Sequence, residues 1–254
     1  MLWLGLAKMK PKIVVISGLT ASGKTALSIL LAKQFNAEII SADSRQVYQG
    51  LDIGSAKITK DEMQGVPHHC LDLVDPADNK RYSVGDFQRD AYAKIDEITA
   101  RGKLPMLVGG TGLYSRAVIK GYGFDGEPNE PRYDVLQICL VPPNTILAPK
   151  VKLRNVQRVE QGMFDETRNL LARGVAEDFL YKLGLEYRLN VRYLKGEIDL
   201  EKYYDELYHQ TMQFIKRQRT WYRKEDPTCT HYLTEPTTYE QDASKLIAQF
   251  LTKK

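Results

Sequence analysis

The part of the chain that most limits its possible folds is residues 12–25. The stretch KIVVIS is a continuous run of mostly β-branched apolar residues, and it leads directly into GLTASGKT. Leucines then recur at helical spacing, at Leu27, Leu30 and Leu31. A buried strand that ends in Gly-x4-Gly-Lys-Thr and opens a helix is the P-loop arrangement. This order predicts an α/β fold with the loop at the carboxyl end of a strand.

Strands and helices continue to alternate after this loop. Such alternation indicates a parallel sheet with helices on both faces, as in P-loop NTPases and kinases. From about Lys150 onward the pattern is helical, which predicts a C-terminal helical part. The predicted elements are strands over 37–44, 104–112 and 134–141, a helix that presents Phe87, Ala91, Ile95 and Ile98 and ends at Gly102, a helix from about Leu113, a helix over 201–224, and a short strand and a terminal helix after Pro227.

The chain divides into four predicted parts. Residues 124–131 read FDGEPNEP, and this acidic, proline-bearing stretch is typical of a linker. The four parts are the first part of the P-loop α/β core over 11–123, the short linker over 124–131, the last core strand and the C-terminal helices over 132–226, and a tail strand and helix over 227–254.

The composition is that of an ordinary globular protein. The net charge of the 254 residues is only +4, so nucleic-acid binding would need a local basic patch. The apolar run at the start of the chain is too short to span a bilayer, so we expect no membrane association. Three cysteines, Cys70, Cys139 and Cys229, are too few and too scattered for a disulfide framework. This favours a reducing compartment and a cytoplasmic protein.

The glycine-rich loop is predicted to hold phosphate groups. Glycines let the backbone approach a ligand, successive N–H groups point at its oxygens, and the helix that follows adds positive potential. Lys24 would neutralise charge on a diphosphate, and Thr25 would offer its hydroxyl to Mg²⁺. The alternative is a glycine-rich turn that holds no ligand. The residues predicted to bind diphosphate are Gly18, Thr20, Ala21, Ser22, Gly23, Lys24 and Thr25.

Asp43 ends the predicted second strand and would lie beside the loop, because both follow strands of one parallel sheet. It could cap a helix or pair with an arginine, or it could bind Mg²⁺ as in an NTPase. The residues after it, SRQVYQG, are rich in groups that could hydrogen-bond a base. The other candidate strand ends in Gly109, Gly110 and Thr111 rather than in an aspartate, so the usual hydrolysis machinery is incomplete. This favours a loop that holds a diphosphate leaving group.

The sequence PHHC at 67–70 contains three possible metal ligands. They are adjacent, and no second pair of cysteines or histidines lies at ligand spacing. Adjacent residues cannot easily face one ion, so we expect a junction between a loop and a strand and no zinc site here.

The segment 216–224, KRQRTWYRK, has five basic residues with Trp221 and Tyr222 among them. A solvated basic helix end explains such a segment about as often as nucleic-acid contact does. Basic side chains with interleaved aromatics do suit a phosphodiester backbone and a stacked base. The candidates for RNA contact are Arg217, Arg219 and Arg223.

Several motifs together resemble the tRNA dimethylallyltransferase family. They occur in the family's order and cover about residues 12–120 and 132–226. The DSRQVY and GGTGLY pieces are much more specific than the phosphate loop alone. The motifs are GLTASGKT, ISADSRQVYQGLDIGSAK, PHHCLDLVDP, YSVGDFQRDA, LPMLVGGTGLY and IKRQRTWYR.

The resemblance implies an enzyme that transfers the dimethylallyl group of dimethylallyl diphosphate to N6 of adenosine 37 in tRNA and releases diphosphate. The fold would be that of P-loop kinases, and the loop would hold the leaving diphosphate together with Mg²⁺. Asp43 resembles the general base, and Thr111 resembles the residue that places N6. Ser44, Arg45 and Gln46 would line the adenosine side, so all five residues would contact the tRNA. We expect the enzyme to be a monomer.

The chain departs from this family in two places. The family usually has a helical insertion between the regions that match Gly123 and Arg132, and only eight residues lie between them here. Met212 stands where family members usually carry an arginine thought to contact diphosphate, and Lys216, one turn further on, could substitute. The alternatives that stay open are a P-loop kinase of a nucleotide or small metabolite, a prenyltransferase of free adenine nucleotides, and a catalytically weakened tRNA-binding relative.

Overall fold

A computed structural model describes residues 10–123, 130–226 and 228–253. Its centre is a six-stranded sheet in the order β3-β2-β4-β1-β5-β6, and every neighbouring pair of strands is parallel. This arrangement confirms the predicted P-loop type of α/β fold. The strands are β1 Lys12–Gly18, β2 Ala37–Ser41, β3 His68–His69, β4 Leu104–Gly109, β5 Asp134–Leu140 and β6 His231–Leu233.

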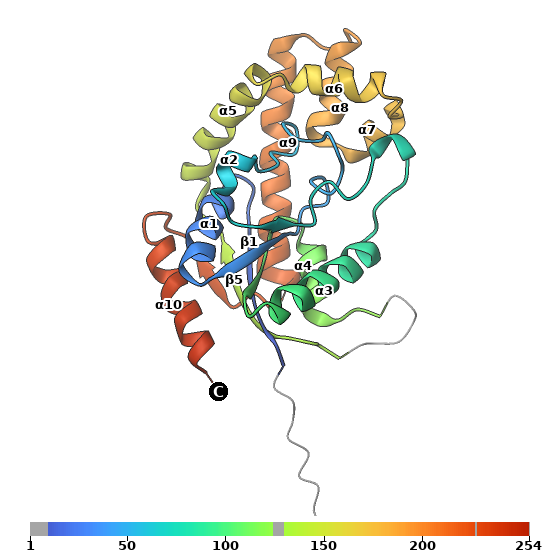
Figure 1. The fold of residues 1–254 in the computed structure, drawn as a ribbon. Helices are drawn as coiled ribbons and strands as arrows, with labels where there is room; N and C mark the ends of the chain where they lie inside the picture. The colour runs from blue at the N-terminus through green and yellow to red at the C-terminus, as the bar shows by residue number, and fades with distance from the viewer. Residues whose placement is uncertain (1–9, 124–129, 227, 254) are drawn as a thin grey trace, which may run out of the picture.

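Helices cover both faces of the sheet because successive residues of a strand point to opposite sides. In β1, Val14 and Ile16 pack into one apolar cluster with residues of α1 and α10, whereas Ile13 and Val15 pack into another with residues of α3 and α4. Figure 1 shows α1 and α10 on one side of the sheet and α3 and α4 on the other. These helices are α1 Lys24–Gln34, α3 Val84–Ala100, α4 Gly112–Lys120 and α10 Tyr239–Thr252.

A helical part lies beyond the carboxyl ends of the strands (Figure 1). It leaves the sheet after β5 and returns through the long helix α9, whose last turn continues as a π-helical turn over Trp221–Glu225. The passage between β2 and α3 also runs towards this end and contains the short helix α2 Lys60–Met63 and the 3-10 turn η1 Pro76–Asp78. The helices of the helical part are α5 Asn144–Glu160, α6 Met163–Ala172, α7 Glu177–Leu183, α8 Leu185–Leu194 and α9 Leu200–Thr220.

The structure corrects some predicted boundaries. β2 ends at Ser41, earlier than the predicted end at 44, because the Asp43 carboxylate accepts a hydrogen bond from the Arg45 N–H (2.9 Å) and turns the chain. α5 begins at Asn144, directly after Pro143, and not at about Lys150. The predicted strand and terminal helix near the end of the chain are confirmed as β6 and α10.

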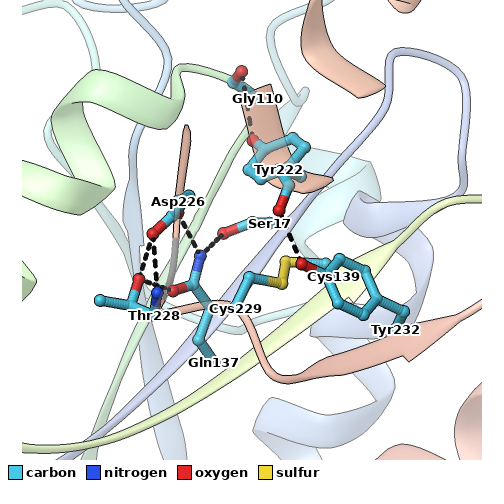
Figure 2. Close-up of a disulfide and its surroundings, with 9 residues drawn as sticks. All are labelled: Ser17, Gly110, Gln137, Cys139, Tyr222, Asp226, Thr228, Cys229 and Tyr232. Atoms are coloured by element: carbon cyan, nitrogen blue, oxygen red, sulfur yellow. Dashed lines mark hydrogen bonds between the residues drawn. A yellow bond between two sulfur atoms is a disulfide. The ribbon is translucent and has the colours of Figure 1, made fainter. Parts of the chain in front are cut away.

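A disulfide joins Cys139 in β5 to Cys229 (Figure 2). The three cysteines were expected to form no disulfide framework, and this single bond was not predicted from the sequence. The parallel pairing of β5 with β6 places Cys139 in register with Tyr232, only three residues from Cys229, and the Cα atoms of the two cysteines lie 6.4 Å apart. Separation along the chain does not report distance in a parallel sheet. Cys70 is buried and free.

The predicted linker over 124–131 is largely outside the described residues, which omit 124–129, and so is the apolar start of the chain, 1–9. Among the helices that the structure describes, none is long and apolar enough to cross a membrane. The remaining sequence-based divisions stay predictions; in the structure β5 begins at Asp134 and β6 at His231.

Candidate active site

One cavity of about 1020 Å³ lies where the strands meet the helical part. Its walls come from the phosphate loop, the segment after β2, the turn between β4 and α4, and helices α5 and α9. Of the predicted site residues, Gly18, Arg219 and Arg223 do not line it. Those that do are Thr20, Ala21, Ser22, Gly23, Lys24, Thr25, Asp43, Ser44, Arg45, Gln46, Thr111 and Arg217.

The phosphate loop has the geometry that an anion site needs. Gly18 passes so close to β5 that a Cβ atom there would lie 2.4 Å from the Leu140 carbonyl oxygen. Lys24 lies in the loop and donates hydrogen bonds to the carbonyl oxygens of Gly18 (3.1 Å) and Leu19 (2.7 Å). The Ser22 hydroxyl is buried and has no partner among the described residues. The loop therefore offers hydrogen-bond donors that can bind an oxyanion.

Lys24 has an unusually low affinity for its proton. Burial lowers the pKa of Lys24, the positive charge of Arg154 lowers it further, and Asp43 opposes them, with a result of about 8. A lysine in such surroundings is stabilised when an anion arrives. The wall around Lys24 is therefore electrostatically prepared for a negatively charged ligand.

Asp43, Ser44 and Thr111 meet at the opposite side of the loop. The Thr111 hydroxyl oxygen accepts a hydrogen bond from the Ser44 N–H (3.1 Å), and the Thr111 N–H donates to the Ala42 carbonyl (3.2 Å). Asp43 Oδ1 is held by the Arg45 N–H, whereas its other oxygen has no hydrogen-bond partner among the residues described. The carboxylate is thus oriented and still has an oxygen available to a substrate.

Gln218 of α9 connects the two halves of the site, although no pattern in the sequence selected it. Its Oε1 accepts a hydrogen bond from the Thr20 N–H (2.8 Å), and its Nε2 donates to the Gly110 carbonyl (3.1 Å). The Tyr222 hydroxyl also donates to Gly110 (3.4 Å; Figure 2). One buried side chain therefore fixes the phosphate loop relative to the turn that carries Thr111.

Arg45 and Gln46 hold the cavity wall together in this structure. The Arg45 guanidinium pairs with Glu186 of α8 (3.0 Å) and donates to the Leu183 carbonyl (2.9 Å). Gln46 bonds to the Ser41 hydroxyl (2.9 Å) and to the Ala56 carbonyl (3.2 Å). If Arg45 and Gln46 contact adenosine as predicted, they can do so only with the parts of their side chains that face the cavity.

Helix α5 supplies basic residues that the sequence-based prediction missed. Lys150, Arg154 and Arg158 line the cavity, and they are spaced four residues apart. Residues with this spacing share one helix face, so the pattern was available as a signal. Arg158 is buried and pairs with Glu186 (2.8 Å) while donating to the Gly54 carbonyl (2.7 Å).

The three arginines near the end of α9 lie in different environments. Arg217 is exposed at the cavity beside the Phe214 ring, 5.7 Å from its centroid. Arg219 donates to the Pro142 carbonyl (3.0 Å) and to Asn144 (2.9 Å), so it anchors the start of α5. Arg223 is exposed and lies outside the cavity wall. Of these three, Arg217 and Arg223 have guanidinium groups accessible to a polyanion.

Neither Met212 nor Lys216 lies in the cavity wall. Met212 packs against the apolar cluster that contains Leu19 and Tyr222, and Lys216 is exposed. The suggestion that Lys216 replaces a diphosphate-binding arginine therefore finds no support in the geometry.

Some conspicuous polar side chains belong to the fold. The predicted junction at PHHC is confirmed, because His68 and His69 form β3, and His69 bonds to the buried Glu38 (2.7 Å). Lys57, whose side chain is almost fully buried, pairs with Asp52 (2.6 Å) and Asp72 (2.5 Å) and ties two loops together.

Comparison with protein families identifies the chain. The model of the IPP transferase family matches residues 46–132 and 123–225, and the isopentenyl transferase model matches residues 11–77. The chain belongs to the IPP transferase family. This IPP transferase is accordingly a transferase, as predicted.

Known relatives agree with this assignment. The chain is 35% identical to tRNA dimethylallyltransferase 2 of Treponema denticola over 274 aligned positions, which cover 83% of this chain and 91% of that protein. It is similar to the crystal structure of the full-length tRNA isopentenylpyrophosphate transferase from Bacillus halodurans, with a TM-score of 0.86, 33% identity, and coverage of 95% of this chain and 97% of that one. A eukaryotic dimethylallyltransferase captured acting on tRNA shares the fold, with a TM-score of 0.80 at 22% identity over 92% of this chain and 77% of that one.

The alignment with the Treponema denticola relative also shows a difference in length. Its 274 positions exceed the 254 residues of this IPP transferase, so the relative has residues without a counterpart here. The two ranges matched by the IPP transferase model overlap at 123–132, which is where the predicted linker lies.

Proposed function

We propose that this IPP transferase moves the dimethylallyl group of dimethylallyl diphosphate to N6 of adenosine 37 in tRNA. The observation that supports this most directly is the meeting, in one cavity, of a phosphate loop with an oriented carboxylate and the Thr111 hydroxyl. The names of the relatives, which refer to tRNA, supply the acceptor by analogy.

In the proposed reaction the adenine N6 attacks the allylic carbon, the carbon–oxygen bond to diphosphate breaks, and N6 loses a proton. Asp43 accepts that proton with the oxygen that has no partner among the described residues. Thr111, held by Ser44, positions N6. The loop N–H groups, Lys24 and Ser22 stabilise the charge on the departing diphosphate. Adenine has to leave its stack to enter the cavity.

We propose Mg²⁺ as the cofactor. Thr25 lines the cavity with an exposed side chain, so its hydroxyl suits an oxygen-preferring cation bound to the diphosphate. No group of three or more histidine, cysteine, aspartate or glutamate side chains in the described residues is arranged to hold a metal, so substrate oxygens and water would complete the shell. Mg²⁺ would neutralise charge on the leaving group.

The decisive experiment combines labelled dimethylallyl diphosphate with three acceptors: tRNA, tRNA lacking adenosine 37, and AMP. Label transfer to tRNA alone, dependent on adenosine 37 and Mg²⁺, is the expected result. Transfer to AMP would instead favour a prenyltransferase of free nucleotides. Phosphate transfer from ATP with no use of dimethylallyl diphosphate would identify a kinase and refute the proposal.

The Asp43→Asn variant tests the assigned base. We expect single-turnover prenylation to slow by about 10²–10⁴-fold, while affinity for dimethylallyl diphosphate stays within a few-fold, because Asp43 is not assigned to the diphosphate. Asp61→Asn is the matched control, since Asp61 is exposed and outside the cavity wall. A wild-type chemical step in Asp43→Asn would eliminate Asp43 as the base.

Two proposals concern the protein as a whole. Its tRNA substrate implies a cytoplasmic location, which cell fractionation can test. We also propose that the protein acts as a monomer, and a molar mass near 29.0 kDa by light scattering is the expected result.

A further inference from the structure

Arg154 has no acidic partner among the residues that the structure describes. It lies on α5, it is half-buried, and it lines the same cavity as Lys24 and Asp43. Within 10–123, 130–226 and 228–253, no residue forms a hydrogen bond or an ion pair with its guanidinium. Its neighbours differ in this respect, because Arg45 and Arg158 share the two carboxylate oxygens of Glu186. Both carboxylate oxygens of Glu186, which is buried in this wall, are therefore already paired with other arginines.

The positive charge of Arg154 acts on Lys24. Burial and then the charge of Arg158 lower the pKa of Arg154, while Glu186 and Asp43 oppose the shift. Arg154 in turn is the largest charge that lowers the pKa of Lys24. Two partly desolvated cations that repel each other are unfavourable unless an anion lies between them.

We propose that Arg154 is a diphosphate-binding residue that faces the phosphate loop across the cavity. The diphosphate would lie between the loop N–H groups with Lys24 on one side and the Arg154 guanidinium on the other. A planar guanidinium can donate two parallel hydrogen bonds to phosphate oxygens, which a lysine cannot do. This inference rests on the proposed function and assigns a second wall to its diphosphate site.

The test is calorimetry with inorganic pyrophosphate and Mg²⁺. Arg154→Gln is expected to weaken the affinity for pyrophosphate by about 10–100-fold. Its urea midpoint should be no lower than that of the wild type, because the guanidinium of Arg154 bonds to none of the described residues and its removal relieves repulsion from Arg158. Lys152→Gln is the matched control, since Lys152 is exposed on the same helix and does not line the cavity.

A second variant keeps the inference open to refutation if Arg154→Gln fails to fold. Arg154→Lys retains the charge but not the paired donors, so we expect a smaller loss of affinity, about 3–10-fold. Affinity within twofold of wild type in whichever variant folds would overturn the role of Arg154, even if Lys24→Ala abolishes binding. If wild-type protein binds no pyrophosphate and prenylates no acceptor, the proposed function itself fails.

Discussion

Gln218 should be the side chain whose loss uncouples the two halves of the active site. Gln218→Met removes the hydrogen bonds to the Thr20 N–H and to the Gly110 carbonyl while keeping most of the volume. The Thr20 N–H faces the cavity and can regain a water molecule, and Gly110 keeps the Tyr222 hydroxyl, so neither group is left wholly unpaired. Two net hydrogen bonds of about 1 kcal/mol each then predict a loss of about 1–3 kcal/mol in the free energy of unfolding.

The effect on catalysis should exceed what stability alone explains. A loop that is free to shift relative to Thr111 misplaces the diphosphate, and we expect kcat/KM to fall at least about tenfold under conditions where the variant is fully folded. Gln218→Glu should bind pyrophosphate more weakly still. A Cβ atom built on Gly110 would lie 3.0 Å from Gln218 Nε2 and 3.9 Å from Lys24 Nζ, so a carboxylate at 218 would stand beside the phosphate site.

The assays are urea denaturation, pyrophosphate calorimetry and single-turnover prenylation. Gln213 lies on the same helix and is exposed, so Gln213→Met and Gln213→Glu are controls for helix propensity and for charge. If Gln218→Met has the wild-type urea midpoint and the wild-type affinity for pyrophosphate, the two hydrogen bonds neither stabilise the fold nor position the loop, and the reasoning is refuted.

Two further predictions concern tRNA binding and acid stability. Replacing Arg217 and Arg223 with Gln should flatten the slope of log affinity for tRNA against log salt by about 0.7–0.9 for each phosphate that is no longer neutralised. Arg219→Gln should mainly reduce stability, because the Arg219 guanidinium already bonds to Pro142 and Asn144. Equal salt slopes in all variants would contradict this assignment. Burial alone would raise the pKa of Glu38, but hydrogen bonds from Arg101, His69 and Lys103 outweigh it and lower the pKa to about 2. The ionised form of Glu38 therefore stabilises the folded state by about 1–3 kcal/mol, after allowance for solvent screening of its exposed partners. This stabilisation is complete above the unfolded-state pKa near 4.5 and is lost as the pH falls towards 2. The stability difference between wild type and Glu38→Gln, measured by urea titration, should shrink from pH 6 to pH 2, and a difference independent of pH would count against the ion cluster.

The fold and the phosphate loop could be predicted because their signals are local. Strand, loop and helix follow one another within 12–34, so the sequence carries the whole arrangement. Asp43 and Thr111 could be placed beside the loop because the carboxyl ends of parallel strands meet at one edge of the sheet. The exact end of β2 could not be predicted, because the turn depends on a side-chain hydrogen bond of Asp43.

The rest of the site depends on contacts between distant parts of the chain. Gln218 bonds to Thr20 across 198 positions, and no pattern near either residue announces that contact. The basic stripe of α5 was visible in its spacing, but only the structure shows that Arg158 has an acidic partner and that Arg154 has none among the described residues. The spacing could have indicated this helix face, although no sequence-based prediction used it, and only the long-range packing shows which of its residues lacks a partner among those described.

The bond between Cys139 and Cys229 has a consequence for how the molecule unfolds. It closes a loop with a sequence separation of 90 residues, and that loop contains helices α5 to α9. In the polymer treatment, closing a loop of this length removes unfolded-state entropy worth about 4–5 kcal/mol, against a total stability of roughly 5–15 kcal/mol for a native domain. The disulfide keeps the two ends of the helical part close together even when the chain is unfolded. In a reducing cytoplasm the disulfide is reduced. The helices that carry Arg154 and Gln218 then depend on packing alone to stay over the phosphate loop.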